Sequence, residues 1–122
     1  MEEVNIPYGV NRIGVGAFSM NLSLKKIDIP NSVTIIDIAS FKYAPLDSIV
    51  IPENVTYIGR EAFYYNENLQ KVYSLPTVPP ATGDVANFCP NLPFKISSKN
   101  ATLYVPKGSL EAYRESEVFA IY

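Results

Sequence analysis

A unit of 22 or 23 residues occurs three times in the sequence, and this repetition constrains the fold more than any other feature. The copies run from Ile6 to Ile27, from Ile29 to Ile49 and from Ile51 to Val72. Self-similarity at a fixed period is the signature of a solenoid, whose coils stack on one another. Three columns recur at intervals of 23 and then 22 positions, and a fourth closes each unit: Pro7, Pro30 and Pro52; Ile13, Ile36 and Ile58; Phe18, Phe41 and Phe63; and Leu24, Leu46 and Leu69.

The third copy indicates what one coil contains. Leu69 to Tyr73 alternates apolar and polar residues, as a half-buried strand does. Val55 to Ile58 is short, β-branched and extended, and Gly59 is expected to allow a bend. Ala62-Phe63 is expected to sit on a single helical or 3₁₀ turn, which is unstable in isolation. Stacking must therefore hold the turn, and the Phe column should form an internal ladder.

The recurring pattern IPxxVxxIGxxAFxxxxxL resembles the BspA-type leucine-rich repeats of bacterial surface proteins. The resemblance covers Val4 to about Val72, and Leu103 to Tyr113 is similar to the LYVPxGSxxAY closing segment of these proteins in Bacteroides and related gut bacteria. The second copy departs from the pattern at Asp37, for Gly, and Ser40, for Ala, which we expect to affect local turn geometry. The resemblance implies a right-handed leucine-rich-repeat solenoid of the α/β horseshoe superclass. We expect it to be β-dominated, with short helical or 3₁₀ turns and a C-terminal cap.

The period fails after Tyr73, so the chain divides into two parts of one domain. Residues 1–73 are predicted to form three leucine-rich repeats, and residues 74–122 a degenerate repeat and the C-terminal cap. Asn87-Phe88 stands where Ala-Phe stood in the earlier copies. Leu92 to Thr102 is then an insertion, and a strand restarts at Leu103 to Pro106.

The two ends of the predicted solenoid differ. Ser109 to about Glu117 is predicted to form a short capping helix, with Ser109 as its N-cap and with Leu110 and Tyr113 facing the last coil. The N-terminal side has no recognisable cap, so we expect it to be exposed, covered by missing repeats, or covered by another copy of the chain. Self-association through this uncapped repeat is therefore predicted. Because the chain begins within a repeat, we expect it to be an excised fragment, or a mature form given a new Met1.

Composition excludes several classes of function. The chain has no His, so neither a Ser-His-Asp site, a Cys-His site nor a His/Cys zinc site is possible within it. The single Cys89 is expected to be a small, partly buried filler. The formal net charge is −2 with dispersed Lys and Arg, which argues against nucleic-acid binding. The apolar runs are far shorter than the roughly 20 residues of a membrane-spanning helix, and Met1-Glu2-Glu3 is acidic, so we expect no membrane insertion and no secretory signal in this chain. We expect no catalytic residue, metal or cofactor.

The outward positions of the strands are the candidate binding residues, because leucine-rich-repeat proteins commonly bind partners on this face. Tyrosines suit such a face, since they offer a large amphipathic area at low entropy cost. Tyr57, Tyr64 and Tyr65 also fall at surface positions, where they form either a binding strip or ordinary partly buried rings. For the outward strand positions too, the alternative to a binding site is a face that is merely solvated. The two candidate columns are Lys26, Ser48 and Lys71, and Asp28, Val50, Tyr73 and Tyr104.

The predicted function is a non-enzymatic protein-interaction or adhesion module of a bacterial cell-surface or secreted protein. The resemblance implies an extracellular or cell-surface location and a protein partner, including host proteins. Two alternatives remain open: a glycan-binding or accessory module attached to a longer polypeptide, and a purely structural spacer.

Overall fold

The computed structural model describes residues 3–81 and 101–116, and these contain eight short strands and one helix. The strands and the helix are β1 (Glu3–Asn5), β2 (Arg12–Ile13), β3 (Lys26–Asp28), β4 (Ile35–Ile36), β5 (Ser48–Ile51), β6 (Tyr57–Ile58), β7 (Lys71–Ser74), β8 (Thr102–Tyr104) and α1 (Leu110–Glu115).

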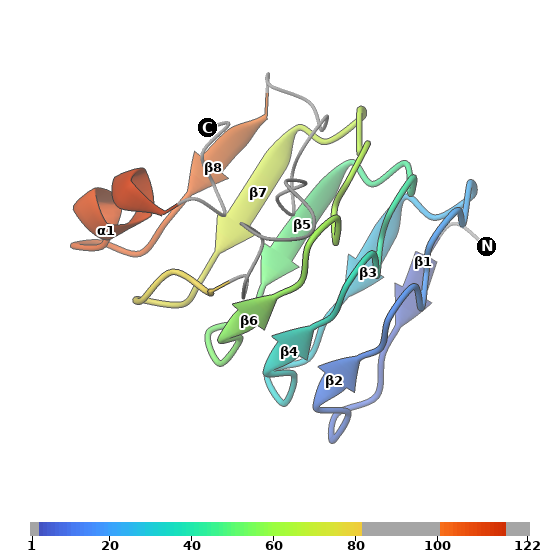
Figure 1. The fold of residues 1–122 in the computed structure, drawn as a ribbon, viewed down its shortest axis with the longest axis horizontal. Coiled ribbons are helices and arrows are strands. Elements are labelled where there is room, and N and C mark those ends of the chain that lie inside the picture. Colours follow the sequence, from blue (N-terminus) through green and yellow to red (C-terminus); the bar gives the residue numbers. More distant parts are fainter. Residues whose placement is uncertain (1–2, 82–100, 117–122) are drawn as a thin grey trace.

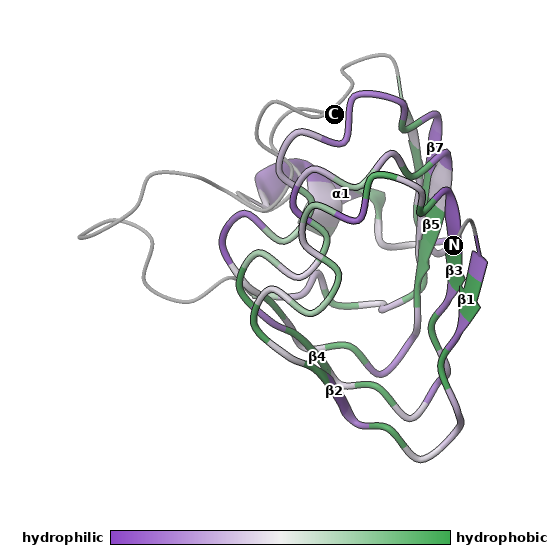
Figure 2. Cartoon of the chain, turned by 90° about the vertical axis from the view of Figure 1, so that its right-hand side faces the viewer, coloured by the Kyte–Doolittle hydropathy of each residue, from purple (hydrophilic) through white to green (hydrophobic). Residues whose placement is uncertain are grey.

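The strands form two walls of a coil, and every strand pair is parallel (Figure 1). The long wall consists of two sheets that lie side by side, β1-β3 and β5-β7-β8, and the short wall is the sheet β2-β4-β6. A backbone hydrogen bond of 3.1 Å from Asp47 N–H to Lys25 C=O joins the segments entering β5 and β3. Each repeat supplies one strand to each wall. Figure 2 shows β1, β3, β5 and β7 on one side of the coil and β2 and β4 on another. The predicted leucine-rich-repeat solenoid is confirmed.

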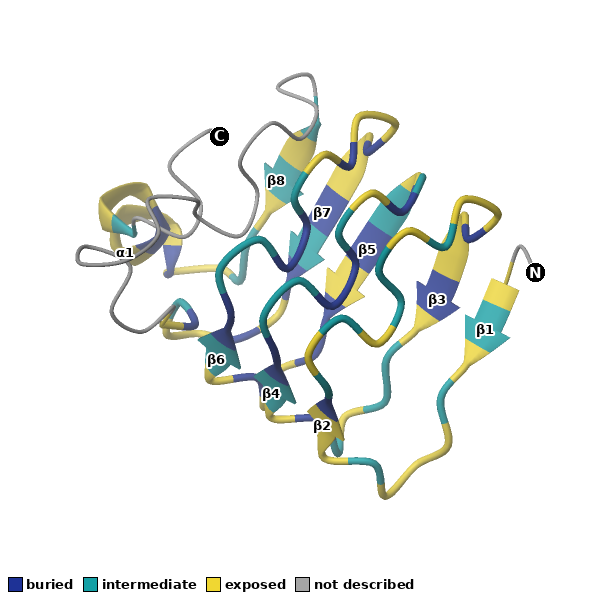
Figure 3. Ribbon diagram, turned by 45° about the vertical axis from the view of Figure 1, so that its right-hand side comes forward, coloured by how far each residue is buried: buried dark blue, intermediate teal, exposed yellow. Residues whose placement is uncertain are grey.

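Apolar columns fill the space between the walls. Phe41 and Phe63 are fully buried, whereas Phe18, in the first repeat, is only partly buried. The three rings stack with centroids 5.4 Å apart at each step, and the planes of successive rings differ by 4° and 7°. The predicted ladder is therefore confirmed. The Ile and Leu columns are buried alongside it, and in β5 and β7 buried positions alternate with exposed or half-buried ones (Figure 3).

The loops that join the short wall to the long wall make turns rather than a helix. In the first two repeats their N–H groups alternate between two acceptors, one three residues back in the same repeat and one in the next repeat. Gly16, Phe18 and Met20 donate to the carbonyls of Ile38, Ser40 and Lys42. A helix would use consecutive N–H groups within one segment. The bonds of 3₁₀ type that were expected are present, but the alternation prevents them from forming a continuous helical turn.

Gly59 is needed for close packing rather than for a bend. A β-carbon built on it would lie 2.4 Å from the backbone nitrogen of Ile38 in the preceding repeat. Gly14, the equivalent residue of the first repeat, has no atom within 4 Å of such a β-carbon. The two glycines share a place in the pattern, but only Gly59 is required by its neighbour.

The C-terminal helix α1 was predicted correctly in position and partly in contacts. Tyr113 is 3% exposed, and its hydroxyl lies 2.7 Å from Ser74 Oγ and donates to Pro76 C=O at 2.6 Å. Leu110 does not face the last coil, because it is 51% exposed. Ser109 precedes the helix, but its hydroxyl donates to Thr77 C=O instead of accepting from a helical N–H. The helix is thus anchored by side chains that reach the end of β7 and the segment after it.

Several sequence predictions lie outside the described residues. These are the degenerate coil at Asn87-Phe88, nearly all of the insertion from Leu92, and the environment of Cys89. The start of the restarted strand is described and differs by one residue. Thr102 was assigned to the insertion, yet β8 includes it, because Thr102 pairs with Lys71. The strand also ends at Tyr104, two residues before the predicted end at Pro106.

Candidate binding face

The long wall carries the predicted binding residues in two outward columns. The register aligns Ser48 with Lys71, and Val50 with Tyr73 and then with Tyr104. Lys26, Asp28, Val50, Lys71 and Tyr104 are exposed, and Ser48 and Tyr73 are half-buried. The structure thus brings the seven residues to one face.

Three members of the column that begins with Asp28, namely Val50, Tyr73 and Tyr104, form a continuous apolar strip on this face. The Tyr73 and Tyr104 rings stack with centroids 4.7 Å apart and an angle of 14° between their planes. Val50 lies beside Tyr73 in the register, and Val50 and Tyr104 are each 44% exposed. Aromatic pairs on neighbouring strands stabilise a sheet by about 0.2–1 kcal/mol. Part of this strip remains open to solvent and is available for contact.

The first column is polar, and the structure extends it beyond the sequence prediction. Glu3 lies beside Lys26, and Thr102 beside Lys71. These two residues were not predicted, because Glu3 precedes the first repeat and Thr102 was assigned to the insertion. The long wall therefore presents a polar column next to the apolar strip of β5, β7 and β8.

A second group of aromatic residues lies on the loops, away from the long wall. The Tyr43 ring contacts Tyr64 edge-on and Tyr65 at a tilt, with centroids 5.8 and 5.2 Å apart. Lys42 Nζ lies 5.6 Å from the Tyr43 centroid and 5.3 Å from that of Tyr64, and it pairs with Glu61 Oε1 at 3.1 Å. The hydrogen bond to Glu61 raises the pKa of Lys42, so this lysine stays charged.

Tyr64 and Tyr65 were noted from the sequence, but Tyr43 was not. The available signal was its place two residues after Phe41, which matches the place of Tyr65 after Phe63. Tyr57, the other tyrosine noted, is half-buried in the short wall and so lies apart from both groups.

A sequence model of the family described as "BspA type Leucine rich repeat region (6 copies)" matches residues 1–103. The chain belongs to this BspA-type leucine-rich-repeat family. It is also similar to a solved structure, that of a leucine rich cell surface protein from Faecalibacterium prausnitzii, with 38% sequence identity and a TM-score of 0.60. The match covers 61% of this chain and 20% of that one, so the chain corresponds to a small part of that protein's length. A comparison with curated proteins gave no match.

Membership in the BspA-type family gives a coarse functional class. Leucine-rich-repeat folds are typically interaction scaffolds without catalytic activity, and the similar solved protein is a cell surface protein. Together these findings suggest a surface interaction module. In the part of the chain that the structure describes, no helix is long and apolar enough to cross a membrane. Among the same residues, no group of three or more His, Cys, Asp or Glu is placed to hold a metal ion.

The second repeat of this BspA-type domain departs from the family pattern at Asp37, and the departure has a structural role. Arg12 of the first repeat donates to Asp37 Oδ2 through Nε, at 2.8 Å, and through Nη2. Asp37 Oδ1 accepts from the Ile38 N–H at 2.8 Å. Burial acts to raise the pKa of Asp37, but the bonds from Ile38 and Arg12 together hold it below the ordinary value. The sequence prediction of a purely local change was incomplete, since this pair connects two coils.

Proposed function

We propose that the chain is a non-enzymatic protein-interaction or adhesion module of a bacterial cell-surface or secreted protein, and that its partner binds the long wall. Family membership and the surface location of the similar protein support the general class. The single observation that carries the choice of face is the partly exposed apolar strip of Val50, Tyr73 and Tyr104 beside a polar column.

The shape of the long wall suits a macromolecular partner. Five strands spaced about 4.8 Å apart extend about 20 Å, a width that suits contact with another protein. Stacking fixes the Tyr73 and Tyr104 rings before any partner arrives, so binding costs little side-chain entropy. Lys26 and Lys71, together with Glu3 and Asp28, place exposed charges of both signs around the strip, and such charges contribute specificity for a complementary partner. A host extracellular protein is the partner class we propose.

The direct test is a triple substitution on the long wall: Lys71→Ser, Tyr73→Ser and Tyr104→Ser. A panel of immobilised extracellular host proteins is screened with the unchanged protein, and the affinity of each binder is then measured with the variant. We expect at least a tenfold loss, because buried Tyr anchors commonly dominate interface energies. Unchanged affinity in a variant that still melts cooperatively would exclude the long wall.

The control is a second triple variant with the same change of composition elsewhere: Lys107→Ser, Tyr8→Ser and Tyr57→Ser. Tyr8 and Lys107 are exposed off the strands of the long wall, and Tyr57 is in the short wall. We expect this variant to keep its affinity. A structural spacer would instead show no binding in either form, across both protein and glycan panels.

Self-association through the first repeat is a second proposal, and exposed apolar side chains favour it. Tyr8, Val15 and Met20 are 82%, 64% and 63% exposed, and all three lie in the first repeat. Burying such surface contributes about 25 cal/mol per Å². Sedimentation equilibrium at rising concentration should reveal a dimer that Val15→Glu weakens; a strict monomer at millimolar concentration contradicts this proposal.

A further inference from the structure

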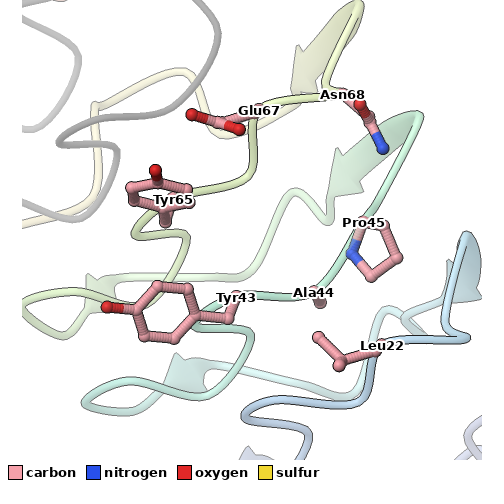
Figure 4. A pocket seen from close by; sticks show the side chains of 7 residues that line it. All are labelled: Leu22, Tyr43, Ala44, Pro45, Tyr65, Glu67 and Asn68. Carbon is pink, nitrogen blue, oxygen red and sulfur yellow. The ribbon is translucent and has the colours of Figure 1, made fainter.

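We propose that a hollow among the loops of the three repeats binds one neutral pyranose residue of a glycan, between Tyr43, Tyr65, Glu67 and Asn68. This site is separate from the long wall, because it lies on the loops that lead from the short wall to the long wall (Figure 4). The proposal of a sugar site can therefore be tested independently of protein binding on the long wall.

The hollow arises from a difference in length between the repeats. Five residues separate the Phe and Leu anchors in the first and third repeats, whereas only four, Lys42 to Pro45, do so in the second. The shorter middle loop is drawn inward, and Ala44 becomes fully buried. Leu22 of the first repeat and Glu67 of the third then line the hollow beside Ala44 and Pro45 (Figure 4).

A buried side chain holds this arrangement in place. The Asn66 amide donates to Phe41 C=O at 2.9 Å and to Ala44 C=O at 3.0 Å. It thereby links the loop that carries Tyr65 to the residue at the base of the hollow. The site is consequently preformed, and binding does not have to order it.

The size of the hollow favours one sugar ring. Its volume is about 240 Å³, below the ~300–1,000 Å³ of pockets that enclose drug-sized ligands. The hollow is shallow and widely open to solvent, so a longer glycan can place one residue in it while its other residues remain in solvent. We therefore expect weak binding to a single sugar, strengthened when several copies of the glycan are displayed together.

The lining matches the two kinds of surface that a pyranose offers. The Tyr43 and Tyr65 rings, with centroids 5.2 Å apart and 36% and 40% exposed, present apolar faces to the C–H side of a sugar. Glu67 accepts hydrogen bonds from hydroxyl groups, and the Asn68 amide both donates and accepts. The negative charge of the Glu67 carboxylate raises the pKa of Tyr65, which places the two groups close together in the hollow. The negative charge of Glu67 disfavours acidic sugars, and for this reason we specify a neutral one.

The backbone conformation at Tyr43 and Tyr65 permits substitutions that test the site and preserve the fold. Tyr43 and Tyr65 have φ of 61° and 62°, in the left-handed region that Asn tolerates better than Tyr. Tyr43→Asn and Tyr65→Asn therefore remove the rings while relieving the backbone. A loss of sugar binding in these variants cannot be attributed to unfolding if their melting temperatures are unchanged or raised.

The experiment titrates the protein with the methyl glycosides of glucose, galactose, mannose, N-acetylglucosamine and N-acetylneuraminic acid, followed by amide chemical shifts. We expect at least one neutral glycoside to shift the resonances of residues 43–45 and 65–68, and its affinity to fall at least tenfold in Tyr65→Asn and in Tyr43→Asn. Tyr8→Asn is the matched control, and it should bind normally. The triple long-wall variant should also bind the sugar normally.

Three results would overturn the proposal. The first is the absence of any shift with all neutral glycosides at 50 mM; the second is unchanged affinity in Tyr65→Asn. The third is a preference for a proline-rich peptide over every sugar at the same resonances, because that would assign the hollow to a peptide. None of these results bears on the long wall, so the two proposals fail separately.

Discussion

Gly59 and Ile38 approach so closely that no side chain fits between them: a β-carbon on Gly59 would lie 2.4 Å from the Ile38 backbone nitrogen. Gly59→Ala must therefore move one repeat relative to the next. We expect it to lower the free energy of unfolding by about 3 kcal/mol, at the upper end of overpacking costs. Urea denaturation measures this value.

Gly14→Ala is the matched control, because a β-carbon at Gly14 meets nothing within 4 Å and the φ of Gly14 lies outside the left-handed region. This substitution should leave stability unchanged or raise it by about 0.4–1 kcal/mol through a less flexible unfolded chain. Equal losses for the two substitutions would show that the close approach of Gly59 is not what matters.

Phe41 lies in the middle of the stacked rings and should contribute more than Phe18. Phe41→Ala is expected to cost about 3–5 kcal/mol, the range for a fully buried Phe. Phe18→Ala should cost clearly less, since the Phe18 ring is only partly buried. Thermal and urea unfolding compare the two. If Phe18→Ala proved as damaging as Phe41→Ala, the first repeat would be more buried than described.

The Arg12–Asp37 pair predicts a loss of stability in acid. Because the pKa of Asp37 is held below its ordinary value in the folded state, the unfolded state binds more protons. The stabilisation is complete above the unfolded pKa of about 3.9, and it is lost as the pH falls through the lower folded value. Urea midpoints between pH 7 and pH 2.5 measure this dependence. In Asp37→Asn, we expect a lower midpoint at pH 7 and a shallower fall below pH 4. An identical fall in both proteins would remove Asp37 as its source.

The Tyr113 hydroxyl should anchor the C-terminal helix. Tyr113→Phe removes the bonds to Ser74 Oγ and Pro76 C=O, which lie in a buried site. We expect a loss of about 1–3 kcal/mol, the cost of leaving buried polar groups unsatisfied. Leu110→Ala, in the same helix, is the control, because Leu110 is exposed and should change stability by less than about 0.5 kcal/mol. Equal effects would mean that the helix is held by something other than Tyr113.

The sequence predicted what recurs from one repeat to the next. The Phe ladder, the strands at Lys71 and Tyr57, and the outward position of Tyr73 follow from columns of like residues, and the structure confirms each of them. The position of a residue that stacks on its counterpart in the next repeat can be predicted from the period alone, without any distance across the coil. For this reason the fold and the candidate face were both accessible from the sequence.

What occurs in only one repeat was not predictable in this way. The Arg12–Asp37 pair depends on a distance between coils that the period does not give. The hollow beside Ala44 depends on how far a loop shortened by one residue is drawn inward. The Ser109 hydroxyl donates to Thr77 C=O because of how α1 packs. Its position before the helix therefore predicted the wrong hydrogen-bond partner.

The most direct test of binding on the long wall is a lysine footprint of the complex. Reductive methylation of the protein with and without a bound protein partner, read by mass spectrometry, reports which lysines the partner covers. Lys26 and Lys71 lie on the long wall, whereas Lys107 lies beyond β8. We predict that the partner protects Lys26 and Lys71 from methylation and leaves Lys107 reactive. Full reactivity of Lys26 and Lys71 in the saturated complex would contradict binding on this face.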